Sequence, residues 1–547
     1  MEKIPVICTT VLVEKSPQAL PLGAACISSA INHDEISKNL CNSKLICFSL
    51  EDKELQNKNE QEQAEFIAQK ILQNLPDDTK NPSIVCFSVF VWNKNLLEKA
   101  ASILKEKNIT TIAGGPEITA HPFEKGVFDF IITGEGEYKV PKLISKIINK
   151  DVPADKIFEN EKNDFSETAS LENLSSVYLD GTLDPGEYGG ALWELARGCP
   201  FKCSYCYESK GGKKVRYFPM ERIEKELDLF AAKKVSQVFV LDPTYNIDKA
   251  RALHILQLIQ KKTPDTFYYF EARAEFIDKQ LASAFTKIPC ALQIGLQSAN
   301  ENVLRLVNRP FNKKQFVKNI GILNQTGVIF GFDLIYGLPG ETFGSFLEGI
   351  DFALSLYPNN LEIFCLSVLP GTDLFDRAKE LNLTYQEKPP YHIIKTDKFS
   401  QNDIQSAQKI ANACSFFYNQ GRAVPWFNTI CKTLKIRSAA FFQTFADFMI
   451  SKNISPDSCS QTFSHKEIEN IQIDFITQLF TKKGLKKYIT AATDIIRFNG
   501  ALSRKTDTGK SEKITLNYPA EYIDSEYALD LKFFAENIPQ KKDTIVI

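Results

Sequence analysis

The sequence contains no run of 18 or more apolar residues, so none of its segments reads as a transmembrane helix. Charge of one sign is also lacking, because 65 Lys and Arg residues stand against 67 Asp and Glu residues, which leaves a net charge of −2 at pH 7. This balance provides no general attraction to nucleic acid. The chain starts with a strand-like run rather than a leader-like segment, and we therefore expect a cytoplasmic protein without a membrane span.

The cysteines do not form a disulfide framework. There are 13, an odd number, and most lie singly within apolar runs, as Cys86 does between Val85 and Phe87. Such placement is typical of buried, reduced thiols in a reducing compartment. The exception is a group of three cysteines in the middle of the chain.

Cys199, Cys203 and Cys206 form a Cys-x3-Cys-x2-Cys run with no fourth cysteine or histidine nearby. Three thiolates this close together can hold three irons of a four-iron, four-sulfur cluster and leave the fourth iron open to a ligand. A zinc site needs a fourth protein ligand, which the neighbouring sequence does not supply. The alternatives are part of a zinc site or three reduced thiols in a loop.

This run, with Tyr205 directly before the last cysteine, resembles the signature of the radical S-adenosylmethionine (SAM) superfamily. The resemblance implies that the open iron binds the amino and carboxylate groups of SAM, and that the reduced cluster cleaves SAM to a 5′-deoxyadenosyl radical. Other stretches resemble the same family: Gly295–Ser298 with Asn308-Arg309, Gly331–Thr342, and Leu369–Thr372.

Residues 1–150 alternate strand-like and helix-like segments, which predicts a doubly wound parallel sheet of the Rossmann type. Such sheets bind ligands at the carboxyl ends of their strands. Three expected strand ends carry distinctive residues, namely Ser88, Phe90 and Trp92, then Gly114 and Gly115, then Glu135 and Gly136 within Gly134–Glu137. Paired glycines allow a bulky ligand to approach the backbone closely.

This arrangement resembles the cobalamin-binding domain that precedes the cluster motif in one class of radical SAM enzymes. The resemblance implies that these same seven residues contact cobalamin. The Asp-x-His-x-x-Gly segment that supplies a cobalt ligand in many cobalamin proteins is missing, because neither His33 nor His121 fits that pattern. We therefore expect cobalamin without this histidine ligand. The alternative is a sheet that has lost the cofactor and serves as a scaffold.

Three further regions follow. The polar stretch 151–188 is expected to be a linker, and the renewed alternation over 189–390 predicts a partial (β/α)6 barrel with its chemistry at the carboxyl ends of the strands. Residues 391–547 predict a mainly helical domain of unknown role, with a helix through Ile471, Phe475 and Leu479. Within that domain we expect a mobile polar loop over 503–511 and a final helix over 524–537.

Strand periodicity predicts which side chains of the barrel point inward. Glu271, Arg273 and Glu275 share one face of an expected strand over 267–275, and Gln293, Gly295 and Gln297 share one face of the next, as do Ile329, Gly331 and Asp333. Inward polar residues are costly unless they meet a ligand or one another, as Glu271 and Arg273 could.

The usual Gly-Gly-Glu of the second barrel strand is absent, and Leu241–Asn246 stands in its place, so the group that holds the SAM amino end stays open. The SAM-binding candidates that the resemblance implies are Tyr205, Asp242, Thr244, Glu271, Arg273, Gln297 and Ser298.

These features predict a cobalamin-dependent radical SAM C-methyltransferase that receives electrons from a donor such as flavodoxin or ferredoxin and acts on a small-molecule, peptide or lipid substrate. Radical rearrangement, cyclisation or epimerisation without methyl transfer is the second hypothesis. A non-catalytic cobalamin or iron–sulfur sensor is the third. RNA methylthiolation is disfavoured because the sequence has no second cysteine triad and no evident RNA-binding module.

Overall fold

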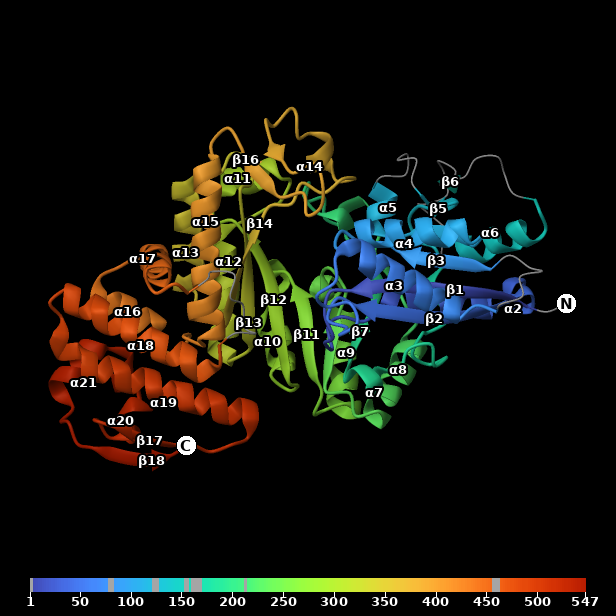
Figure 1. Ribbon diagram of the computed structural model, residues 1–547. Helices are drawn as coiled ribbons and strands as arrows, with labels where there is room; N and C mark the ends of the chain where they lie inside the picture. The colour runs from blue at the N-terminus through green and yellow to red at the C-terminus, as the bar shows by residue number, and fades with distance from the viewer. Residues whose placement is uncertain are drawn as a thin grey trace.

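The computed structural model describes residues 3–76, 83–120, 127–151, 157–158, 170–210, 214–454 and 463–547. Figure 1 shows the N-terminal sheet in blue and the C-terminal helices in red on opposite sides of a green barrel. Within these ranges, no helix combines the length and apolar character that crossing a bilayer requires.

The N-terminal part is a six-stranded sheet in the order β2-β1-β3-β4-β5-β6, and every neighbouring pair is parallel. The predicted doubly wound α/β fold is therefore confirmed. The strand order reverses between β1 and β3, which is where such sheets bind ligands. The strands are β1 Ile4–Leu12, β2 Cys41–Ser49, β3 Ile84–Ser88, β4 Thr110–Gly114, β5 Phe130–Ile132 and β6 Ile157–Phe158.

Helices cover both faces of this sheet, so each face buries its own apolar cluster. On one face, Leu97, Ala101 and Leu104 of α4 are fully buried, as their i, i+4, i+7 spacing predicts. The helices are α1 Leu22–His33, α2 Ser37–Leu40, α3 Glu60–Gln73, α4 Lys94–Glu106, α5 Pro116–Ala120 and α6 Lys139–Ile148.

The central part is a second six-stranded parallel sheet in the order β14-β13-β12-β11-β10-β7, which confirms the partial (β/α)6 barrel. Its strands are β7 Gly190–Trp193, β10 Gln237–Val240, β11 Phe267–Ala272, β12 Cys290–Gln297, β13 Ile329–Tyr336 and β14 Asn360–Cys365. Its outer helices are α8 Met220–Ala232, α9 Lys249–Lys262, α10 Lys279–Phe285, α11 Glu301–Leu306, α12 Lys313–Thr326 and α13 Phe343–Ser355.

Alternate residues of β12 differ in burial, as a strand between a lumen and a helical layer requires. Leu292, Ile294 and Leu296 are buried in the core, whereas Gln293 and Gln297 are partly exposed on the other face. The predicted inward face of this strand is therefore correct.

The expected strand 267–275 is too long. β11 ends at Ala272, and Ala274–Phe276 form a 3-10 turn. The Asn246 side chain replaces the next ladder bonds, since Arg273 N–H donates to Asn246 Oδ1 (3.0 Å) and Asn246 Nδ2 donates to Arg273 O (2.9 Å). Beyond Ala272 the periodicity of two no longer applies, and the Arg273 side chain pairs with Glu275 at 2.7 Å.

Part of the expected linker is packed rather than irregular. Val177, Tyr178 and Leu183 are buried in the barrel core, and Pro185–Tyr188 form the short helix α7. Residues 152–156 and 159–169 of that stretch lie outside the described residues. His121 lies outside them as well.

The C-terminal part is mainly helical, as predicted, and shares one continuous hydrophobic core with the barrel. Its centre is a group of phenylalanines, in which Phe417 makes edge-on contacts with Phe441 and Phe445. An antiparallel pair that the sequence did not reveal closes the domain. The elements are α15 Gln401–Cys414, α16 Phe427–Leu434, α17 Ser438–Ser451, α18 His465–Lys482, α19 Ile489–Thr508, β17 Lys513–Leu516, α21 Leu531–Asn537 and β18 Asp543–Val546.

Two expectations for this domain are wrong. The stretch 503–511 is mostly helical, because α19 continues to Thr508 and only 509–511 lie outside a helix or strand, and Arg504 pairs with Glu469 (2.6 Å) and Glu512 (2.5 Å). The final helix is also shorter than expected and begins only after Asp530, whose side chain accepts hydrogen bonds from the next turn.

Candidate active site

The three cysteines lie in a loop at the carboxyl end of the barrel. The loop runs between β8 (Ala196–Arg197) and β9 (Arg216–Tyr217), which pair antiparallel directly after β7. Ser204 anchors it from both sides, since its N–H donates to Val307 O (3.0 Å) and its carbonyl accepts from Leu374 N–H (2.8 Å). We call residues 199–206 the cluster loop.

The donor set of the cluster loop fits an iron–sulfur cluster. Cys203 is buried, while Cys199 and Cys206 are half-buried. Burial raises the pKa of Cys206 to about 11 and also raises the pKa of Cys199, so both thiols need a metal or another cation to ionise. Among the residues that the structure describes, no three His, Cys, Asp or Glu side chains gather closely enough to hold one metal ion. A cluster places each cysteine on a different iron, which suits this all-thiol set better than zinc does.

Arg309 lies against the cluster loop. Its Nη1 donates to Cys203 Sγ at 3.8 Å, and its Nη2 donates to Gly295 O. From the sequence, Arg309 was evident only as part of a motif that resembles the family, without a role of its own. The Asn308-Arg309 pair was the signal that could have identified it.

A second arginine reaches the same loop. The Arg273 guanidinium stacks on the ring of Phe201 at 3.8 Å and pairs with Glu275 at 2.7 Å. Arg273 therefore packs against the cluster loop. The sequence allowed a pair between Glu271 and Arg273, but among the described residues Arg273 pairs with Glu275 instead.

Carboxyl groups of the barrel strands face one another across the lumen. Glu271 stays accessible to water, yet barrel atoms surround it, and this burial together with the nearby Asp333 raises its pKa to about 7. Burial also raises the pKa of Asp333 to about 6, although a hydrogen bond from Gln293 opposes the rise. These groups can accept hydrogen bonds from a polar ligand in the lumen.

Gln297 stands at the end of β12 with a positive φ of 68°, and within the described part of the chain its buried Oε1 has no hydrogen-bond partner. A Cβ on Gly295 would come within 2.5 Å of Gln297 Nε2, so the Gln297 side chain would have to move. Its neighbour Ser298 is buried and donates to Glu341 Oε1 at 3.4 Å. The structure thus brings Gln297 to the lumen and turns Ser298 toward Glu341.

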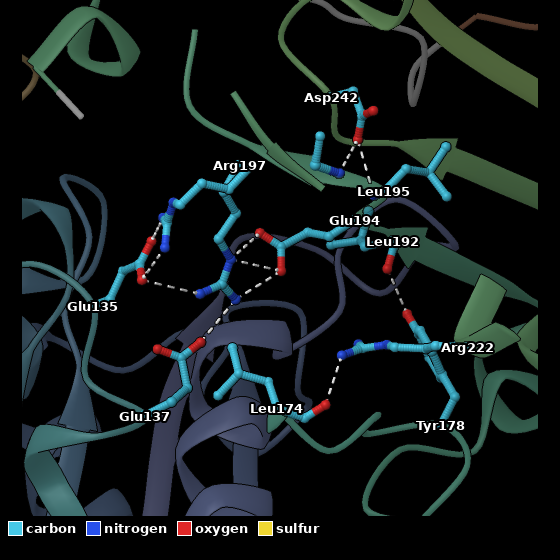
Figure 2. Close-up of polar contacts among 12 residues, drawn as sticks. Glu135, Glu137, Leu174, Tyr178, Leu192, Glu194, Leu195, Arg197, Arg222 and Asp242 are labelled. Atoms are coloured by element: carbon cyan, nitrogen blue, oxygen red, sulfur yellow. Dashed lines mark hydrogen bonds and ion pairs between the residues drawn. The ribbon is translucent and has the colours of Figure 1, made fainter. Parts of the chain in front are cut away.

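Asp242 and Thr244 lie directly behind the cluster loop. Asp242 is buried, and its Oδ1 accepts hydrogen bonds from the backbone N–H groups of Leu195 and Ala196, both at 2.9 Å (Figure 2). Burial raises its pKa to about 7. Thr244 donates to Pro243 O at 2.7 Å. Both residues support the loop, and their contact with SAM stays a prediction.

An aromatic pair lies at the β1/β3 switch point of the N-terminal sheet. Phe90 and Trp92 stack with their ring centres 4.6 Å apart, and Trp92 Nε1 donates to Val11 O (3.0 Å) across the switch point. Trp92 is 46% exposed, and Ser88 lies buried beneath the loop. This surface is flat and apolar at the place where such sheets bind ligands, and it therefore fits a large planar cofactor such as a corrin.

The glycines at this edge differ in what a side chain at each position would contact. Gly115 adopts φ +106°, and a Cβ there would lie 2.6 Å from Val89 O, so the turn itself requires glycine. A Cβ on Gly136 would meet Ile27 at 2.7 Å. A Cβ on Gly114 would make only ordinary contacts, the nearest at 3.5 Å, so Gly114 is the member of the pair that a close ligand could require.

We call the carboxyl-terminal edge of the N-terminal sheet the cofactor edge; it carries Ser88, Phe90, Trp92, Gly114, Gly115, Glu135 and Gly136. His33 does not lie on this edge. It ends α1, which runs antiparallel to the strands, so it lies near their amino ends, where its Nδ1 is 2.9 Å from Ser29 O. This position agrees with the absence of the histidine motif.

The cluster loop and the cofactor edge border each other. Tyr207, just after the last cysteine, donates through Oη to Pro116 O at 3.2 Å. Arg216 pairs with Glu135. Arg197 pairs with Glu137 at 2.7 Å, as Figure 2 shows. The carboxyl ends of both sheets therefore face one shared region.

Comparisons with known proteins agree with this arrangement. Residues 193–353 match the radical SAM superfamily, and residues 379–514 match DUF4080, a family of unknown function. The chain is 27% identical over 345 residues to the cobalamin-dependent radical SAM methyltransferase TokK of Streptomyces tokunonensis, a match that covers 55% of this chain and 49% of TokK. The chain thus spans about half the length of that relative.

Two solved structures share the fold. The cobalamin-dependent SAM radical enzyme OxsB, with aqua-cobalamin and SAM bound, matches 98% of this chain and 83% of its own with a TM-score of 0.57 and 14% identity. The radical SAM methyltransferase TsrM of Kitasatospora setae matches 74% of this chain and 84% of its own with a TM-score of 0.53 and 13% identity. The match over residues 193–353 identifies a radical SAM domain in this chain, and the two solved structures show a shared overall fold.

Proposed function

We propose that the protein is a cobalamin-dependent radical SAM methyltransferase that methylates an unreactive carbon. The observation that carries this proposal is the shared border of the cluster loop and the cofactor edge, where Tyr207 meets Pro116 and Arg216 meets Glu135. Two cofactors bound at these sites would face one region, as transfer to a single substrate carbon requires.

In this proposal Cys199, Cys203 and Cys206 hold the cluster. When bound and reduced, the cluster supplies the electron that cleaves SAM to a 5′-deoxyadenosyl radical. SAM lies in the lumen, where Glu271 and Gln297 accept hydrogen bonds from its polar groups, and Asp242 keeps the cluster loop in position.

Tyr205, Thr244, Arg273 and Ser298 complete the proposed SAM surroundings. Tyr205 packs beside the cysteines, and burial raises its pKa well above the usual value, so its phenol stays neutral. A neutral phenol can donate a hydrogen bond without adding negative charge beside the cluster loop.

Cobalamin, when bound, supplies the methyl group. The stacked Phe90 and Trp92 present an apolar platform that excludes water from one side of the corrin, and Ser88, Gly114 and Gly115 shape the edge below it. Glu135 and Gly136 border the same edge. A reduced flavodoxin or ferredoxin is the proposed electron donor, and a small molecule is the proposed substrate class.

The test uses the full chain reconstituted without oxygen with iron, sulfide and hydroxocobalamin, then supplied with dithionite and SAM labelled in its methyl group. We expect 5′-deoxyadenosine and label in the corrinoid fraction. Cleavage without labelled corrinoid would favour rearrangement, cyclisation or epimerisation, and neither product would favour a sensor.

Substitution of a ligand provides the control. Cys203→Ala is expected to lose both the bound iron and the SAM cleavage, whereas Cys47→Ala, which changes a half-buried cysteine in the N-terminal sheet, keeps both. SAM cleavage that survives in Cys203→Ala would contradict the proposed ligand set.

A further inference from the structure

Two arginines flank the cluster loop, and both contact the same loop of the N-terminal sheet. Arg197 and Arg216 are register partners in the β8/β9 pair, one before and one after the three cysteines. Both pair with carboxylates of the strand-end loop Gly134–Glu137 in the N-terminal sheet, and Figure 2 shows the contacts of Arg197. The ribbon that closes the cluster loop is thus tied by charge to the other domain.

The inner contact belongs to Arg197. Its Nη2 lies 2.7 Å from Glu137 Oε1 and 2.8 Å from Glu194 Oε2, and its Nη1 lies 3.8 Å from Glu135 Oε2. The side chains of Arg197 and Glu137 are only 14% and 10% exposed. Salt screens such partly buried pairs weakly.

The outer contact joins Arg216 to Glu135, whose side chains are 32% and 29% exposed. Water and ions reach this pair, so added salt weakens it more than the inner contact. The two contacts can therefore be distinguished in solution.

The inner contact is charged throughout the neutral range. Burial alone would raise the pKa of Glu137, but the Arg197 guanidinium outweighs it and holds that pKa below the usual value. Removing Arg197 would leave the buried Glu137 carboxylate without its close partner, whereas removing Glu137 would leave Arg197 with Glu194 and Glu135.

We propose that Arg197 is a positioning residue: through Glu137 it ties the cluster loop to the cofactor edge, so that the two keep a constant separation and orientation. The purpose of this tie rests on the proposed function, because misplacement of reacting groups by about 1 Å can cost 100-fold in rate. The contact itself does not depend on bound cofactors. Glu135, on the cofactor edge, then acts on the β8/β9 pair through the arginines that it binds.

The test is amide hydrogen exchange of the full chain, measured by mass spectrometry without cofactors. Glu137→Gln and Glu194→Gln each remove one carboxylate from Arg197, but only Glu137 belongs to the other domain. We expect Glu137→Gln to speed exchange about tenfold in both the 134–140 and the 199–207 peptides, as the loss of one charge-assisted hydrogen bond predicts. In Glu194→Gln the change should stay within the barrel peptides.

A milder comparison covers the case in which Glu137→Gln does not fold. Arg216→Gln should speed exchange slightly in the same two peptides, and 1 M salt should reproduce that effect in the unchanged protein but add little to Arg216→Gln. The proposal would be overturned if Glu137→Gln and Glu194→Gln changed the exchange rates of the two peptides equally. It would also be overturned if neither Arg216→Gln nor salt changed those rates. Because this readout needs no SAM, a protein that fails to cleave SAM would refute the proposed function and leave this result intact.

Discussion

The carboxylate of Asp242 accepts a hydrogen bond from the backbone N–H of Ala196 at 2.9 Å, across 46 residues of sequence. The same oxygen also holds Leu195 N–H. Asp242, just after β10, thereby fixes the start of β8, three residues before the cluster loop begins at Cys199. Asp242 serves the cluster loop through the backbone whether or not it also touches SAM.

Two substitutions separate these roles. Asp242→Ala leaves two buried N–H groups without an acceptor, and we expect a loss of about 1–3 kcal/mol in the free energy of unfolding for each group. Asp242→Asn keeps an acceptor oxygen and should unfold near the original temperature. If Asp242 also binds the SAM amino group, Asp242→Asn will bind SAM more weakly at unchanged stability, which equilibrium dialysis and thermal unfolding can measure together.

Arg309 places a positive charge beside Cys203, the buried cysteine of the cluster loop. A cation stabilises the reduced, more negative form of a cluster, so Arg309→Gln should shift the reduction potential to more negative values. An EPR-monitored redox titration of the reconstituted protein measures this shift. Arg309→Lys should restore part of it, and Arg305→Gln, on the exposed side of α11, should leave the potential unchanged. An unchanged potential in Arg309→Gln would contradict the prediction.

Glu271 makes the stability of the cofactor-free chain depend on pH. Its pKa of about 7 in the folded protein exceeds the ordinary value of 4.5, so the folded state binds more protons between these values. Stability should therefore fall as the pH rises through this window. Glu271→Gln should flatten the decline in unfolding temperature between pH 5 and pH 8, with Asp333 accounting for part of the remainder. The exposed Glu106→Gln serves as the control, and an equal slope in both variants would show that Glu271 is not the source.

The glycine pair allows a matched test at the cofactor edge. Gly115→Ala forces a Cβ into a backbone with φ +106° and to within 2.6 Å of Val89 O, so we expect a destabilisation of about 1–3 kcal/mol in urea unfolding. Gly114→Ala should unfold as the unchanged protein does. If a corrin lies against this loop, Gly114→Ala will bind hydroxocobalamin more weakly, as absorbance titration can detect. Unchanged corrin binding would place the cofactor elsewhere.

Features that depend on nearby residues could be predicted from the sequence. The cluster loop is such a feature, because Cys199, Cys203 and Cys206 are close in the chain itself. The two parallel sheets are another, because the alternation of strands and helices repeats over short segments. The missing histidine motif also agreed with the place of His33 at the wrong edge of the sheet.

Long-range contacts decided the rest. Strand periodicity predicted that Arg273 shares a face with Glu271. In the structure the Asn246 side chain bonds the Arg273 backbone where β11 ends, and the Arg273 guanidinium stacks on Phe201. A polar composition predicted a loop after Ser503, but Arg504 found Glu469 and Glu512 on other elements and kept the helix intact.

The sequence by itself predicted three cysteines as cluster ligands, and it determined the α/β architecture and the radical SAM character of the barrel. Only the tertiary structure decided that Arg309 meets Cys203 across 106 residues and that Arg197 joins Glu137 of the other domain. The physical reason is that spacing and periodicity encode what neighbours along the chain do, whereas the pairing of distant charges depends on how the packed sheets bring them together.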